Sequence, residues 1–358
     1  MDADGVLASR LARQRLTGLP AATALQVVSE LLCVQSQDAP LARAMIALRC
    51  AGAEDATVRA AVAAGEVVRT HILRPTWHYV AAKDLRWLLR LTSPKVESGM
   101  AARHRVLELA PRRIDVGLGL IAERLARRAF ASRTELGVAF AEAGLLDRDD
   151  PQFGQQVGHL LLVAELRGLI CSAPLDLLDH RYALVDDVVP AAQEFNRASA
   201  LDVLVERFIA GHGPVALTDL TRWARITLTE ARAAASRLGE AITATRVDGV
   251  ELFGPSAAAP VASDPARAWL LSTFDEAFLS YRAVPWPRSP HHPDSDEPYR
   301  FAEAGGGVVI LDRRDVGSWK RTRPGGRTQI TLRLDPTLSG VEREAVDAAV
   351  HSLVRILG

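Results

Sequence analysis

A helical region that ends in a β-hairpin lies between residues 198 and 253. Apolar residues recur with helical spacing at 198–209, and further helices are expected at 218–223 and 226–238. Two strand-like runs follow, and Asp248-Gly249 between them is a strong signal for a tight hairpin turn. Helices followed by a hairpin are the element order of a winged helix, in which the hairpin is the wing.

The same order of elements occurs at the start of the chain. Residues 6–34 are expected to form two helices separated by Gly18-Leu-Pro20, and residues 54–65 a third helix. Residues 67–80 are rich in β-branched residues and predict two short strands on either side of Arg74-Pro75. These residues predict a first winged helix.

The middle of the chain gives a further copy of this unit. Ser132-Arg-Thr-Glu135 is a capping-box signature for the start of a helix. The other expected elements are a helix at 81–91, an Arg-rich connector at 103–113, helices at 118–130 and 150–166, and wing strands at 168–171 and 181–185. Three copies of one unit predict a tandem array.

The C-terminal part of the chain is different. After an Ala-, Pro- and Ser-rich linker, most runs are strand-like, and the chain closes with an amphipathic helix. The linker is expected at 254–265, the strands at 269–274, 307–311, 316–321 and 329–334, and the helix at 341–357. The predicted fold is α+β, with three tandem winged helices at 1–105, 106–192 and 193–256 and a small β-barrel-like domain at 266–358.

Composition limits the class of protein. The chain has 43 Lys and Arg against 43 Asp and Glu, so a basic surface for DNA can come only from local segregation of charge. Cys33, Cys50 and Cys171 are far apart in apolar settings, which is typical of a reducing compartment rather than a disulfide framework. No run reaches the roughly 18 apolar residues of a membrane span, and no signal-peptide pattern is present. We therefore expect a cytoplasmic, nucleoid-associated protein.

The loop at 285–298 contains adjacent His291 and His292 together with acidic residues. Such a loop could bind a metal, but no third ligand follows at a set spacing. A solvated loop is the favoured interpretation, and we expect no metal and no cofactor.

The stretch Leu31–Pro40 contains the best candidates for chemistry. Gln35 and Gln37 lie on either side of Ser36, where the preceding helix is expected to end before Pro40. Residues two apart do not share a helix face, but in an unwinding last turn or an extended segment they can converge on one water. A polar helix end facing solvent is the alternative.

The chain resembles the AlkZ-like winged-helix DNA glycosylases, a family that includes the YcaQ branch, from about residue 11 to residue 320. The motifs that carry the resemblance are Val34-Gln-Ser-Gln-Asp-Ala-Pro40, Arg74-Pro-Thr-Trp-His78 with Asp84-Leu-Arg-Trp87, Gly168-Leu-Ile-Cys171, Gly213-Pro through Trp223, Phe274-Asp-Glu276 with Tyr281, and Val309-Ile-Leu-Asp312 with Gly317-Ser-Trp-Lys320. Six motifs in the same order are specific for the family but not for one substrate. This chain differs from the family pattern at Ser36, where a larger apolar residue is common, and at Pro75, where glycine is usual.

The resemblance implies that three winged helices and a barrel hold duplex DNA and that Gln35 and Gln37 are catalytic. Each amide carbonyl can accept a hydrogen bond from one water and direct it at the anomeric carbon. A purine alkylated at N7 is already cationic and leaves easily, so positioned water would suffice. The expected substrate is duplex DNA with bulky or crosslinked N7-alkylated purines, acted on by a monomeric, monofunctional glycosylase.

Several other residues near these motifs are candidates for the same site. Asp38 is a possible carboxylate, although a turn or cap role is favoured. His71 and His78 bracket the first wing, where a phosphate or lesion contact and a hairpin histidine bonded to backbone stay open, with the resemblance favouring His78. The candidate DNA contacts are Arg49, Arg69, Arg74, Thr76, His78, Lys320, Arg321 and Arg323.

Two other functions are open on sequence alone. A winged-helix protein can bind DNA as a regulator without chemistry, but no expected helix here concentrates the Arg, Lys and Asn residues that base reading would need. A winged helix can also be a protein interaction module. A regulator would bind selected DNA sequences without turnover, and a protein interaction module would have no affinity for DNA.

Overall fold

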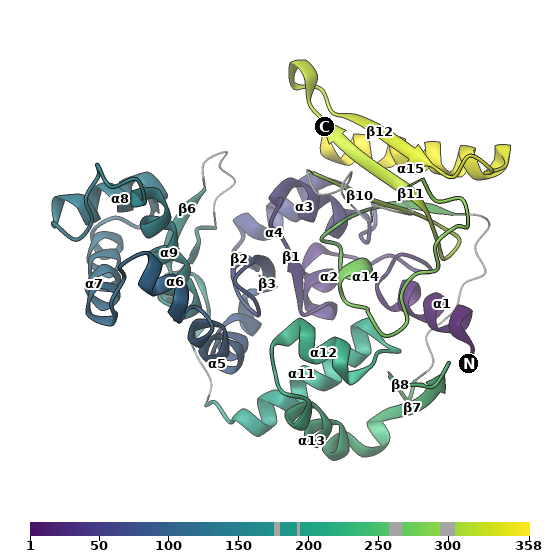
Figure 1. The fold of residues 1–358 in the computed structure, drawn as a ribbon, viewed down its shortest axis with the longest axis horizontal. Coiled ribbons are helices and arrows are strands. Elements are labelled where there is room, and N and C mark those ends of the chain that lie inside the picture. The colour runs from purple at the N-terminus through teal and green to yellow at the C-terminus, as the bar shows by residue number, and fades with distance from the viewer. Residues whose placement is uncertain (175–179, 192–193, 258–266, 294–304) are drawn as a thin grey trace. The chain divides into compact units, whose positions relative to one another are not determined.

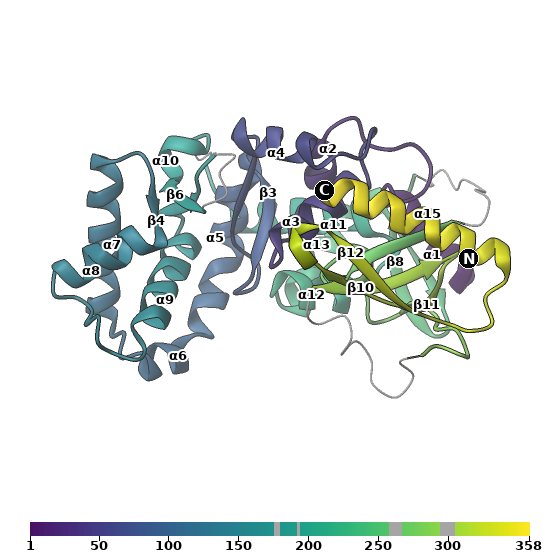
Figure 2. The same cartoon turned by 90° about the horizontal axis from the view of Figure 1, so that it is seen from above.

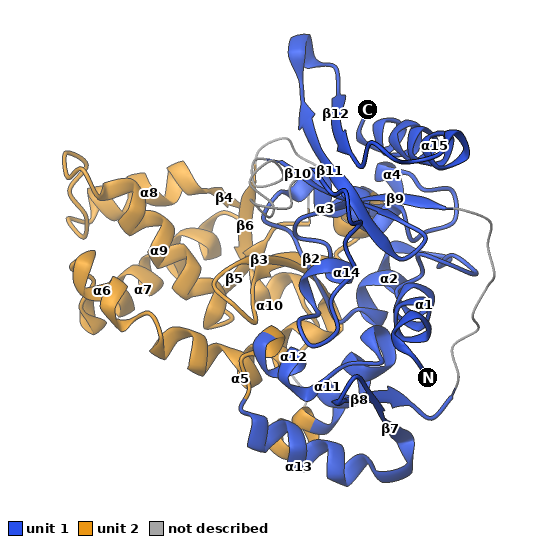
Figure 3. Ribbon diagram, turned by 45° about the vertical axis from the view of Figure 1, so that its right-hand side comes forward, with its two compact units in different colours: residues 1–59, 202–222, 227–358 blue, residues 60–201, 223–226 orange. Residues whose placement is uncertain are grey.

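The computed structural model describes residues 1–174, 180–191, 194–257, 267–293 and 305–358. It mixes helices with small antiparallel sheets and divides into two compact units. Unit 1 comprises residues 1–59, 202–222 and 227–358, and unit 2 comprises residues 60–201 and 223–226 (Figure 3). These units cut across the first expected domain at residue 59, and the division into three winged helices stays a prediction.

The N-terminal part of unit 1 contains short helices and one short strand. They are α1 (Ala3–Arg13), α2 (Ala24–Glu30), β1 (Cys33–Gln35), α3 (Ala39–Ala47) and α4 (Asp55–Ala63), which leads into unit 2. The expected helix through residue 34 is wrong at its end, because Leu32 has a φ of 65° and the chain continues as β1. Pro40 lies in the first turn of α3, so it begins a helix instead of ending one.

A second helical group and a hairpin follow, mostly in unit 1, with residues 197–201 and 223–226 in unit 2. They are α11 (Arg197–His212), α12 (Leu217–Ala224), α13 (Leu228–Leu238), the 3₁₀ turn η1 (Gly239–Ala241), β7 (Ile242–Val247) and β8 (Val250–Pro255). Strands β7 and β8 pair antiparallel around Asp248 and Gly249, which both have positive φ, as the sequence predicts for this turn. Most of the expected linker, residues 258–265, lies outside the described residues.

The C-terminal part of unit 1 is a four-stranded antiparallel sheet with the order β12-β11-β10-β9 (Figure 1). Its elements are β9 (Ala268–Ser272), α14 (Glu276–Leu279), β10 (Gly306–Leu311), β11 (Arg314–Thr322), η2 (Pro324–Gly326), β12 (Gln329–Leu334) and α15 (Gly340–Leu357). Helix α15 packs along this sheet (Figure 2). The expected strands and closing helix are confirmed, and closure into a barrel stays a prediction.

Unit 2 is built from helices around a hairpin and a three-stranded sheet with the order β4-β6-β5. Its elements are β2 (Val67–His71), β3 (Trp77–Ala81), α5 (Ala82–Ser98), α6 (Ala101–Val106), α7 (Pro111–Arg127), β4 (Ala131–Ser132), α8 (Arg133–Glu142), α9 (Phe153–Leu166), β5 (Ile170–Ser172), β6 (Arg181–Leu184) and α10 (Val185–Val188). The predicted capping box at Ser132 and Glu135 is formed. The expected connector at 103–113 is wrong, because its two ends belong to helices α6 and α7.

The core of unit 2 explains why the first hairpin belongs to it. Leu136, Phe140, Leu160 and other apolar residues of α7, α8 and α9 form one buried cluster, and Trp77 of β3 packs against it. Burial of these side chains is the main force that stabilises such a unit. The hairpin β2–β3 therefore shares its core with the following helices.

One of the two loop histidines differs from the prediction, because His291 is exposed and His292 is not. His292 is buried, and its Nε2 lies 3.0 Å from Asp315 Oδ1, so it is part of the packed structure and not of a solvated loop. Residues 294–298 of this loop lie outside the described part of the chain. No group of three His, Cys, Asp or Glu side chains that could hold a metal is found in the residues described. Within the same residues, no helix is long and apolar enough to cross a membrane.

A pH-dependent loss of stability is expected from His159 on α9. Burial, with smaller contributions from His104 and Arg103, lowers the pKa of His159 to about 4. The unfolded chain takes up a proton near pH 6.5 but the folded chain only near pH 4, so the free energy of unfolding should fall as the pH drops through this range, by at most about 3 kcal/mol and less where solvent screens the ring. His159→Phe should flatten the fall, as measured by urea unfolding at pH 7.5 and 5. An equal fall in both proteins would contradict this.

Candidate functional site

The Gln-Ser-Gln segment connects β1 to α3, and only its first residue belongs to the strand. Gln35 is the last residue of β1 and is 7% exposed, Ser36 is fully buried, and Gln37 is exposed. The backbone N–H of Gln35 donates to Glu276 Oε1 at 3.1 Å. Gln35 thus ends a strand and not an unwinding helix, and the convergence of the two amides on one water stays a prediction.

Asp38 is the N-cap of α3. Its Oδ1 accepts from the N–H of Leu41 at 3.0 Å, which satisfies one of the donors that a helix start leaves unpaired. Its Oδ2 accepts from Arg321 Nη2 at 2.8 Å. Both carboxylate oxygens are therefore engaged, which agrees with the cap role favoured from sequence and leaves Asp38 poorly placed to act as a base.

Glu276 lies beside the segment although the sequence had given it no role. It begins the short helix α14, which Asp275 caps by accepting from the N–H of Ala277. Glu276 is 1% exposed, and its Oε2 accepts from Ser280 Oγ at 2.9 Å. His212 Nε2 lies 3.8 Å from the same oxygen. The motif Phe274-Asp-Glu276 is the only sequence signal that pointed to this residue.

Arg49 does not have the DNA-contacting position expected for it. The side chain is 1% exposed, and Nη2 and Nη1 donate to the two carboxylate oxygens of Asp275 at 2.8 and 2.9 Å. Nη2 also donates to Gln14 Oε1, and Gln14 donates in turn to the hydroxyl of Tyr281. Because the guanidinium is buried and paired, a phosphate cannot reach it, and Arg49 is a structural residue.

In unit 2 the structure brings together Arg74, Thr76 and His78. His78 is fully buried, with Nδ1 2.9 Å from the carbonyl oxygen of Thr76 and Nε2 3.3 Å from Arg74 Nη2. This geometry fits a neutral ring that donates from Nδ1 and accepts at Nε2. The buried His78 ring thus has one partner in the backbone, as the alternative of a hairpin histidine expects, and a DNA contact by His78 stays a prediction. Arg74 also donates to the carbonyl of Trp223, at 3.4 Å.

Arg69 and His71 both lie against Trp77 in unit 2. The Arg69 guanidinium lies 4.2 Å from the centre of the Trp77 ring, and the His71 ring lies 4.0 Å from it. His71 Nδ1 is 2.6 Å from an oxygen of Glu165, a fully buried carboxyl group whose pKa is raised by burial. His71 is therefore a hydrogen-bond partner of a buried acid, which sequence reasoning missed because Glu165 lies 94 residues away.

Lys320 and Arg323 lie at the end of β11 and just beyond it. Lys320 is partly exposed and pairs in the sheet with Gly306 and Thr331. Arg323 is exposed, and its Nη2 donates to the carbonyl of Leu357 at 3.3 Å. Both positions leave the predicted phosphate contacts open.

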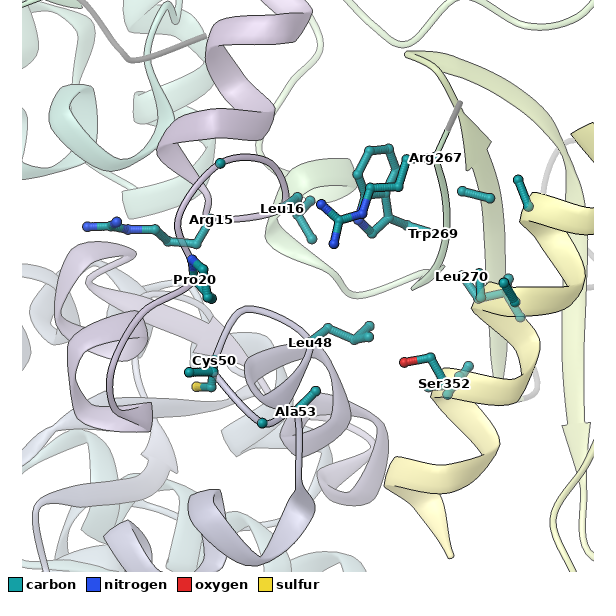
Figure 4. A pocket seen from close by; sticks show the side chains of 18 residues that line it. Arg15, Leu16, Pro20, Leu48, Cys50, Ala53, Arg267, Trp269, Leu270 and Ser352 are labelled. Atoms are coloured by element: carbon teal, nitrogen blue, oxygen red, sulfur yellow. The ribbon is translucent and has the colours of Figure 1, made fainter. Parts of the chain in front are cut away.

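A cavity of about 400 Å³ lies elsewhere in unit 1, between the chain around Pro20 and Cys50 and the C-terminal helix α15 (Figure 4). Its walls include Leu48, Trp269 and Ser352, and Figure 4 shows the Arg267 side chain beside the Trp269 ring. Burial raises the pKa of the Cys50 thiol to about 11. None of the residues expected at the site lines this cavity.

The model of the family described as DNA glycosylase AlkZ-like matches residues 28–356, which include the Gln-Ser-Gln segment, Glu276 and Arg321. The chain belongs to the AlkZ-like DNA glycosylase family. As a member of this family it is a glycosylase that acts on DNA, in agreement with the resemblance found from sequence.

A solved structure supports the same fold. The chain is similar to Streptomyces sahachiroi DNA glycosylase AlkZ with a TM-score of 0.77 and 21% sequence identity, over 100% of this chain and 97% of that one. A search of curated proteins found no match. The AlkZ-like fold thus extends over the whole chain, although the sequences have diverged widely.

Proposed function

We propose that this AlkZ-like glycosylase hydrolyses the N-glycosidic bond of N7-alkylated purines in duplex DNA, including bulky or crosslinked ones, with Gln35 and Gln37 positioning the water. The observation that carries the proposal is the Gln-Ser-Gln connection between β1 and α3, which has a fixed backbone at Gln35 and an exposed side chain at Gln37. The neighbouring carboxylate, Asp38, is engaged by Leu41 and Arg321. Neutral amides are thus the better candidates for orienting water.

The chemistry of the substrate agrees with such a mild site. Loss of a base leaves positive charge on the sugar, and an undamaged purine needs protonation to depart. A guanine alkylated at N7 already carries a positive charge, so its departure needs little acid catalysis. Holding one water at the anomeric carbon converts its attack into an effectively intramolecular step, which can supply a large part of the barrier reduction. A pair of amide acceptors is sufficient for this positioning.

Excision should therefore depend on the charge of the lesion. With duplexes that carry one N7-methylguanine, the wild-type chain is expected to form abasic sites, detected by alkaline cleavage. An otherwise identical duplex with unmodified guanine should react at least about 10³-fold more slowly, because its base is a poor leaving group. A duplex crosslinked through N7 of guanine tests the bulky substrates. Tight binding of the methylated duplex without abasic sites would instead indicate that the protein binds this DNA without excising the base.

A further inference from the structure

The Gln35–Asp38 segment is held at both ends by side chains from the C-terminal part of unit 1. Glu276 accepts from the N–H of Gln35, 241 residues away in sequence, and Arg321 donates to Asp38 across 283 residues. We propose that Glu276 and Arg321 are positioning residues that fix the backbone of this segment and, through it, the two amide side chains. This inference rests on the proposed function of Gln35 and Gln37.

The Glu276 contact is rigid because it is buried. Glu276 Oε1 accepts from Gln35 at 3.1 Å while Oε2 accepts from Ser280 at 2.9 Å, so the carboxyl group is fixed at both oxygens. Asp275, which caps α14 and pairs with buried Arg49, fixes the start of the same helix. A buried polar group has no water to which it can turn, and its geometry is set by these partners. The position of Gln35 is therefore tied to α14.

The Arg321 contact ties the other end of the segment to the sheet. Arg321 pairs with Ile330 of β12, and its backbone N–H donates to the carbonyl of Gly305. The guanidinium of Arg321 then reaches Asp38 at 2.8 Å, and this ion pair is only partly exposed. One carboxylate thus links the start of α3, the Gln-Ser-Gln segment and strand β11.

This arrangement matters because positional catalysis is sensitive to small displacements. A misplacement of about 1 Å can cost on the order of 10²-fold in rate. Gln37 lies between the two fixed points, and its side chain is exposed, so its amide is ordered mainly through the backbone on either side. Removing one contact should lower the rate of the chemical step while leaving the affinity for DNA nearly unchanged.

The test compares Arg321→Met, Asp38→Asn and the double variant. Asparagine caps a helix about as well as aspartate, so Asp38→Asn removes the ion pair but keeps the cap. Single-turnover excision of N7-methylguanine at saturating enzyme is expected to slow about tenfold in each single variant and no further in the double variant, because the two side chains act through one contact. The Kd for duplex DNA should change by less than about threefold.

Two comparisons separate positioning from general structural damage. Arg314→Met removes another β11 ion pair, with Glu342, and should leave the rate unchanged. Glu276→Ala should slow excision, whereas Glu276→Gln should restore part of the rate, because its carbonyl can still accept from Gln35. Full loss of folding in Glu276→Ala would leave the decision to the Arg321 and Asp38 variants, which lie closer to solvent.

A measurement that does not depend on excision separates this inference from the proposed function. Amide hydrogen exchange over residues 35–38 is expected to be faster in Arg321→Met than in wild type or Arg314→Met. If the wild type excises nothing, the proposed function fails and exchange alone decides this inference. Unchanged excision and exchange in Arg321→Met would overturn it. So would a higher Kd with a shallower salt dependence at unchanged rate, which would make Arg321 a phosphate contact.

Discussion

The double substitution of Gln35 and Gln37 by alanine is expected to slow release of N7-methylguanine by on the order of 10²-fold or more. Alanine removes both carbonyl acceptors that the proposed mechanism uses to hold water. The cationic base can also depart spontaneously. The rate of base loss from the same duplex without enzyme is therefore the background for each variant. Abasic-site formation in single turnover, at enzyme concentrations above the Kd of each variant, measures the effect on the chemical step.

The single variants should differ in a way that follows from their surroundings. Gln37→Ala changes an exposed side chain, so the protein should keep the stability of the wild type. Gln35→Ala removes a side chain that is 7% exposed and should also lower the stability moderately. Gln155→Ala, at an exposed glutamine on α9, is the matched control. Wild-type rates in the double variant would show that the amides are not catalytic.

Loss of the buried ion pair between Arg49 and Asp275 is expected to have the largest effect on stability. Asp275→Ala would leave the Arg49 guanidinium buried at 1% exposure without its carboxylate, which should lower the free energy of unfolding by about 3–5 kcal/mol. Urea unfolding at pH 7.5 measures this loss directly. A change below about 1 kcal/mol would mean that the pair is solvated.

The same pair separates a structural role from a DNA contact. Replacing both partners with apolar residues, as in Arg49→Met with Asp275→Leu, should recover part of the stability because no charge stays buried. If Arg49 contacted phosphate, a folded Arg49→Met variant would bind DNA with a salt slope lower by about one unit. From its burial, we expect no change in that slope.

The sequence was informative about local structure wherever one short segment carries the signal. Asp248-Gly249 set the β7–β8 hairpin, and the capping box at Ser132 and Glu135 set the start of α8, because both depend on residues only a few positions apart. It did not predict that a new helix, α3, begins beside Pro40. Proline is excluded from a helix interior but accepted in the first turn, and the sequence around it did not show which side of it is helical.

The candidate site was predicted only in part for a related reason. Gln35 and Gln37 were found from a contiguous motif, but the burial of Arg49 and His78 and the contacts of Glu276 depend on segments far apart in the chain. An arginine in a helical pattern has the same sequence signature whether it contacts solvent or a buried acid. Its role could be separated from that of exposed Arg323 only when Asp275 was located beside it.

By itself, the sequence determined the family, most of the helices and strands, and the pair of amides. Periodicity and short motifs encode these properties within a few residues. The tertiary structure alone decided that Glu276 and Arg321 contact the two ends of the Gln35–Asp38 segment and that Arg49 is buried against Asp275. The physical reason is that burial and hydrogen bonding depend on which distant segments pack together, and one sequence does not state those pairings.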